Sequence, residues 1–154
     1  MCEHAALAAA AAHALSRFPR EACGVVVRGA GGLHFVPVAN VATDPRAAFA
    51  FDASEQLALW LQEAAGAFAI EALVHSHCDA DAGFSSADRR AATADDGSPL
   101  HPGLEHWVLA IRGPRPRLDE AVAWRWRRGN WTGRPLALPP VAGCVSCVTP
   151  QNRI

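Results

Sequence analysis

The chain has 154 residues, of which 51% are hydrophobic, so it is long enough to bury one core and a single domain is expected. A net charge of -1 and a sequence pI near 6.6 indicate no strong electrostatic attraction to nucleic acid or to a membrane surface. Neither is expected as a partner. No apolar stretch is long enough to cross a bilayer, and we expect a cytoplasmic location.

The first forty residues predict a helix followed by a β-hairpin. An Ala-rich run to Leu15 predicts a helix that ends near Phe18 and Pro19. Apolar runs at residues 23–28 and 33–38 predict two strands, because a Gly-rich turn separates them.

The middle of the chain predicts a short strand, a helix and a buried strand. The short strand ends at Phe51, and the amphipathic helix after it is capped by Asp52 or Ser54. The apolar run at residues 70–74 then predicts a buried strand that ends at His75.

The remaining elements complete an α/β pattern. A turn-rich loop at residues 79–83 leads to a short helix that starts near Ser85, and a loop at 95–103 precedes two strands at 106–112 and 118–127. We expect one domain over residues 1–134, with a curved mixed or mostly antiparallel sheet flanked by helices. The Pro-rich residues 135–154 are expected to form a flexible tail.

A candidate metal site stands at the end of the buried strand. His75 and His77 are two residues apart, so on an extended segment they project from the same face. Asp88 lies in the first turn of the following helix, where the helix dipole favours a carboxylate. Two imidazoles and a carboxylate leave a fourth zinc position for water, and Glu21 could then move protons. The structural alternative is that Ser85 and Asp88 form only a capping box beside two surface histidines.

The pattern His75-Ser76-His77, seven residues, Ser85, two residues, Asp88, with Glu21 upstream, resembles the JAMM metallopeptidase family, also called MPN-plus or JAB, in its small prokaryotic form. The resemblance implies an MPN-like fold in which His75, His77 and Asp88 bind Zn²⁺. It also implies that Glu21 is the general acid/base and that Ser85 supports the oxyanion.

Cys78 departs from that pattern, because the family commonly has proline directly after the second histidine. A thiolate near zinc could fill the water position, and a small buried apolar role is the alternative. The pair Cys144 and Cys147 is weak evidence for a second metal or redox site.

The resemblance implies hydrolysis of the amide bond after the C-terminus of a ubiquitin-like or sulfur-carrier protein, whose slender Gly-Gly tail could enter a narrow groove beside zinc. A phage-tail-assembly peptidase of the same family is one alternative. A catalytically silent MPN scaffold that binds partners is another, although the complete ligand set argues against it. The sequence does not indicate an oligomeric state.

Overall fold

The computed structural model describes residues 2–140. Its order is helix, hairpin, helix, strand, helix and three strands. The helices and strands are α1 Glu3–Arg17, β1 Cys23–Gly29, β2 Gly32–Val38, α2 Ala53–Ala64, β3 Ala69–Cys78, α3 Ser86–Ala92, β4 Glu105–Arg112, β5 Arg117–Arg127 and β6 Asn130–Pro135. No helix among the described residues is long and apolar enough to cross a membrane.

The six strands form one sheet in the order β2-β1-β3-β4-β5-β6. Only β3 and β4 pair in parallel, and every other neighbouring pair is antiparallel. The α3 helix and the loop after it connect these two parallel strands, as a crossover requires. The expected α/β domain with a mixed, mostly antiparallel sheet is therefore confirmed.

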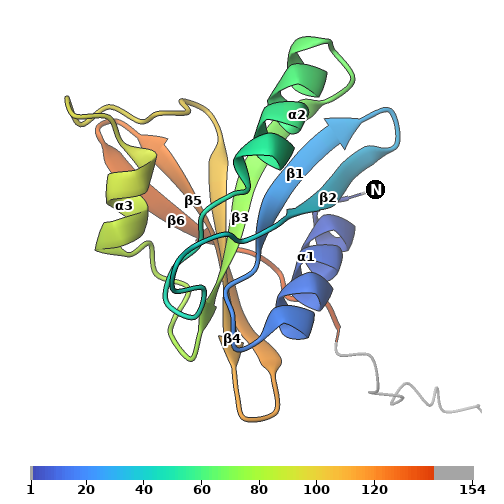
Figure 1. Ribbon diagram of the computed structural model, residues 1–154, viewed down its shortest axis with the longest axis vertical. Coiled ribbons are helices and arrows are strands. Elements are labelled where there is room, and N and C mark those ends of the chain that lie inside the picture. The colour runs from blue at the N-terminus through green and yellow to red at the C-terminus, as the bar shows by residue number, and fades with distance from the viewer. Residues whose placement is uncertain (1, 141–154) are drawn as a thin grey trace, which may run out of the picture.

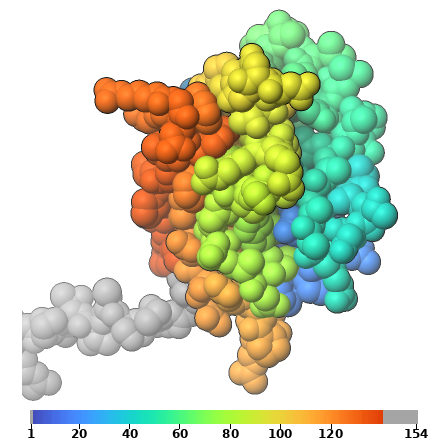
Figure 2. Space-filling view, turned by 90° about the vertical axis from the view of Figure 1, so that its left-hand side faces the viewer, coloured from blue at the N-terminus to red at the C-terminus, as the bar shows by residue number. Residues whose placement is uncertain are grey.

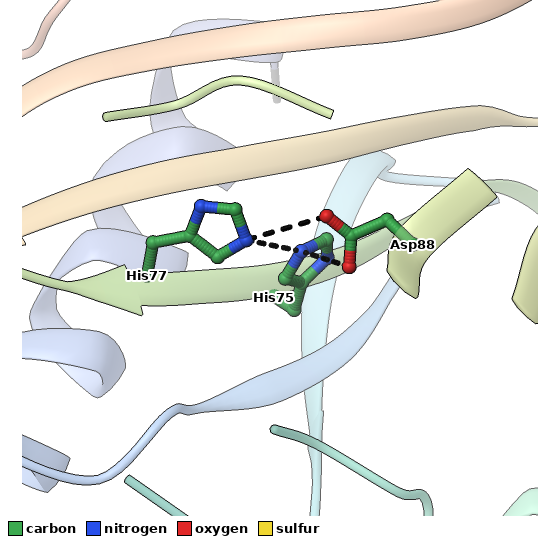
Figure 3. A group of neighbouring side chains, drawn as sticks. All are labelled: His75, His77 and Asp88. Carbon is green, nitrogen blue, oxygen red and sulfur yellow. Dashed lines mark hydrogen bonds and ion pairs between the residues drawn. The ribbon is translucent and has the colours of Figure 1, made fainter. Parts of the chain in front are cut away.

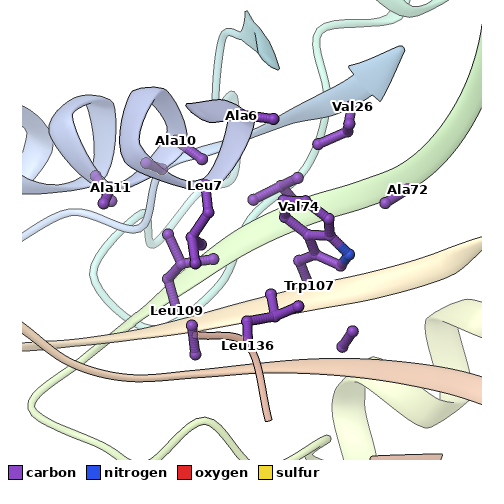
Figure 4. Packing of buried hydrophobic residues seen from close by; sticks show 14 of the residues in the cluster. Ala6, Leu7, Ala10, Ala11, Val26, Ala72, Val74, Trp107, Leu109 and Leu136 are labelled. Atoms are coloured by element: carbon purple, nitrogen blue, oxygen red, sulfur yellow. The ribbon is translucent and has the colours of Figure 1, made fainter. Parts of the chain in front are cut away.

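Helix α1 covers one face of the sheet, whereas α2 and α3 lie on the other (Figure 1). Alanines dominate the buried side of α1, which lets the helix axis approach the strands closely (Figure 4). Its core cluster includes Val74 of β3 and Leu109 of β4. Because side chains alternate along a strand, the neighbouring His75 and Val108 face the α2 and α3 side.

Two sequence predictions differ from the structure in detail. The strand expected before α2 is a single bridge between Asn40 and Phe51, because the intervening residues form a loop. The last strand, β6, was not expected, and it covers the edge of β5. The packed core continues to Leu136, which is buried and donates its N–H to the Ala121 carbonyl at 2.9 Å. Cys144 and Cys147 lie outside the described residues.

Candidate metal centre

The end of β3 and the start of α3 bring His75, His77 and Asp88 together (Figure 3). The strand extends through both histidines, beyond the predicted end at His75, and this extension places the two rings on the same face. The Nε2 atoms of the two rings are 3.2 Å apart. One oxygen of Asp88 lies 3.2 Å from His75 Nε2, and the other lies 3.4 Å from His77 Nε2.

These separations fit a tetrahedral ion. Zinc–nitrogen bonds of about 2.0 to 2.1 Å at tetrahedral angles put neighbouring ligand atoms about 3.3 Å apart. The two histidine nitrogens, 3.2 Å apart, agree with that value, and each has a different Asp88 oxygen at a similar distance, 3.2 Å from His75 and 3.4 Å from His77. Nitrogen and carboxylate donors are ligands that zinc accepts, so both the chemistry and the spacing of the cluster suit it.

The tautomer of His77 is set by the loop that follows β3. Its Nδ1 lies 2.8 Å from the carbonyl oxygen of Asp81, which can only accept a hydrogen bond. Nδ1 therefore carries a proton, and in the neutral ring Nε2 presents a lone pair to the cluster. The loop is held in turn by β5, because Trp124 Nε1 donates to the Ala82 carbonyl at 2.9 Å and Glu120 accepts from the Ala82 N–H at 3.2 Å.

The electrostatics of the cluster favour an ionised Asp88 beside partly buried histidines. Burial opposes the charge of Asp88, but its hydrogen bonds to His75 and His77 hold its pKa well below the usual range. Burial lowers the pKa of His75. Burial also opposes charge on His77, yet hydrogen bonds to Asp88 and to the Asp81 carbonyl raise its pKa overall.

Ser85 and Asp88 do form the capping box, so the structural interpretation of that pair is correct and compatible with metal binding. The Ser85 hydroxyl accepts from the Asp88 N–H at 3.1 Å, and the Ser85 N–H donates to the Asp88 carboxylate at 2.8 Å. Because the hydroxyl acts as an acceptor there, its own proton stays available to a substrate. The cap also fixes the carboxylate on rigid backbone next to the histidines.

Glu21 lies just before β1, in a buried position near the cluster. Its side chain is only 8% exposed. Burial raises its pKa from 4.5 to about 7, while the charge of His77 lowers that pKa and the charge of Asp88 raises it. A carboxyl group that titrates near neutrality is suited to accept and return a proton.

Three residues that sequence reasoning did not single out hold Glu21 and His75 in place. The Asn40 side chain donates to the Glu21 carbonyl at 2.9 Å, and the Ser76 hydroxyl accepts from the Ala22 N–H at 2.8 Å. The ring of Phe49 stacks on His75 at a centroid distance of 4.4 Å. These contacts depend on the tertiary arrangement, and no local sequence pattern indicates them.

Cys78 does not join the cluster. It lies one residue beyond His77, so it projects from the opposite face of β3, toward α1. Burial raises the pKa of its thiol to about 11, which keeps it protonated at neutral pH. The role of a fourth ligand or lid is therefore disfavoured for this residue.

Comparison with known proteins agrees with the site. Residues 3–128 match the family described as prokaryotic homologs of the JAB domain. The chain belongs to this family. The JAB domain therefore spans most of the described residues and carries a His75, His77 and Asp88 cluster compatible with a metallohydrolase.

Two solved structures share the fold of this JAB domain. A protein from Desulfitobacterium hafniense, solved in solution, is 23% identical, with a TM-score of 0.58, over 87% of this chain and 88% of that chain. A solution structure from Salinibacter ruber is 18% identical, with a TM-score of 0.53, over 88% of this chain and 89% of that chain. No curated protein matches the sequence.

Proposed function

We propose that this JAB domain is a zinc-dependent peptidase or isopeptidase that hydrolyses the amide bond after the C-terminus of a ubiquitin-like or sulfur-carrier protein. The observation that carries the proposal is the cluster of two histidine nitrogens and two Asp88 oxygens at separations of 3.2, 3.2 and 3.4 Å, with a buried Glu21 near it. A scaffold without catalysis would not need the complete ligand set.

When bound, zinc polarises a carbonyl and lowers the pKa of water from 15.7 to about 7. His75, His77 and Asp88 would hold it, and the tautomer of His77 is already the one required. Each imidazole must be neutral to bind the ion, and Asp88 must be ionised.

Glu21 performs the proton transfers. Its carboxylate takes a proton from the attacking water as the new carbon–oxygen bond forms. It then gives that proton to the leaving nitrogen as the carbon–nitrogen bond breaks, so the carboxylate is regenerated. Ser85 donates a hydrogen bond from its hydroxyl to the oxygen on which negative charge develops.

The test is hydrolysis of carrier fusions followed by intact mass measurement. A ubiquitin-like or sulfur-carrier protein with a short peptide after its Gly-Gly terminus should be cut once, after the last glycine, by the zinc-loaded protein. Chelator should stop the reaction, and Glu21→Gln should stop it while zinc still binds at about one per chain. Purification without zinc, or equal cleavage by Glu21→Gln, would refute the proposal.

A further inference from the structure

A pocket of about 250 Å³ opens beside the metal ligands, on the side of the sheet that carries α2 and α3. Figure 2 looks onto this side, where α3 and the segment of residues 40–51 lie next to each other. His75 and Asp88 form part of the pocket wall. An occupant would therefore lie directly beside the groups that hold the ion.

The other walls are mostly apolar. Phe49 and Phe51 come from the loop before α2, Phe84 from the loop before α3, and Leu100 from the loop after it. Phe84 is only 5% exposed, whereas Leu100 is 51% exposed. An exposed leucine on the wall of an apolar pocket leaves surface for an incoming apolar group to cover.

The ionisable side chains of the pocket wall already have partners or are buried without charge. Asp88 is engaged by both histidines, and burial lowers the pKa of His106 to about 4, so that ring is neutral at physiological pH. His101 is held edge-on against Trp60 of α2 at a centroid distance of 6.0 Å. A charged side chain entering this space would lose water without gaining a matched partner.

We propose that this pocket binds a large apolar side chain, such as leucine or phenylalanine, of the substrate residue on the nitrogen side of the scissile amide, because the carrier's terminal glycine occupies the carbonyl side. The inference rests on the proposed function, because it takes the reacting carbonyl to lie at the ion. Continuity with His75 and Asp88 places the pocket within one residue of that carbonyl. The volume and the aromatic walls match a single side chain better than a folded partner.

The first test is a peptide series with the zinc-loaded protein, in which each flank of one amide carries Gly, Ala, Leu, Phe or Asp in turn. Leu or Phe on the nitrogen side should raise kcat/KM roughly 10- to 100-fold over Gly, and Asp there should be poorest. Equal rates for Gly and Phe on both flanks would overturn the inference while leaving metal-dependent hydrolysis intact.

A matched pair of variants locates the preference. Ala91 of α3 lines the pocket, so Ala91→Leu should narrow it and reduce the preference for Phe over Gly at least 10-fold. Ala58 is an exposed alanine on α2 that does not line the pocket, and Ala58→Leu should leave the preference unchanged. An unchanged preference in Ala91→Leu would overturn the assignment.

A binding measurement on the metal-free protein separates this inference from the proposed function. N-acetyl-L-phenylalaninamide should shift the NMR amide signals of Phe49, Ala91 and Leu100, whereas N-acetylglycinamide should not. Selective binding of the phenylalanine compound, without hydrolysis of any peptide, would contradict the proposed function but support the assignment of the pocket. Peptide hydrolysis without selective NMR shifts from the phenylalanine compound would contradict only the assignment of the pocket.

Discussion

Replacement of Glu21 by glutamine should stabilise the metal-free protein at alkaline pH. Glutamine keeps the shape of the side chain but cannot ionise. Burial raises the pKa of Glu21 from its ordinary value of 4.5 to about 7 in the fold. The native state therefore prefers the protonated carboxyl, and ionisation costs stability as pH rises from about 4.5 to about 7.

The magnitude follows from the size of that rise. A shift of about 2.5 pH units at 1.36 kcal/mol each amounts to about 3 kcal/mol, and relaxation around the charge reduces it to about 2 kcal/mol. The stability difference between Glu21→Gln and the wild type should be constant below pH 4.5. It should then widen by about 2 kcal/mol by pH 8 in favour of the variant.

Urea unfolding with EDTA and a reducing agent, repeated between pH 4 and 8, measures this difference. The control is Glu71→Gln, which removes an exposed carboxylate paired with Arg28 at 2.7 Å. A surface pair of this kind contributes about 0 to 1 kcal/mol, so its pH dependence should be small. A Glu21→Gln difference that stays flat across this range would refute the assignment of a buried carboxyl with a raised pKa.

Three further changes test the metal centre. Ser85→Ala should cost about 2.7 to 4 kcal/mol in transition-state stabilisation, which appears as a fall in kcat. The lost helix cap should also lower the free energy of unfolding in urea by about 1 kcal/mol. A change confined to KM would contradict the oxyanion role. Trp124→Phe should weaken zinc binding about 10- to 100-fold in a chelator competition, because the loop whose Asp81 carbonyl orients His77 loses its hydrogen bond at Ala82; an unchanged affinity would show that the loop keeps its position without Trp124. Cys78→Ser should leave the zinc content at about one per chain by elemental analysis. A loss of zinc would contradict the placement of Cys78 on the face of β3 opposite to the histidines.

Much of the fold followed from local pattern. The Ala-rich run, the Gly-rich turn after β1 and the cap at Asp52 predicted elements within a residue or two of those observed. The Asp52 side chain accepts from the N–H groups of Ser54 and Glu55, as a cap should. Strand β6 was missed because a stretch with Gly133 and Pro135 has weak strand character, and pairing with β5 overrides it.

The ligand cluster was predictable because its members are close in sequence, whereas its support was not. His75 and His77 share a strand face, and Asp88 follows one loop later. The contacts of Asn40 with Glu21 and of Trp124 with Ala82 join residues 19 and 42 positions apart. Such contacts depend on strand order and register, which no local pattern encodes.

The register between β1 and β3 sets where insertions can be accepted. Cys23 pairs with His75, so Glu21 lies two residues before the pair that contains one of the candidate ligands. A single residue added between Glu21 and Cys23, or removed from β3 before His75, would shift Glu21 relative to His75 by about 3.3 Å and turn side chains to the opposite face. The loop after α3 lies outside this paired segment, so its length does not set the distance between Glu21 and His75.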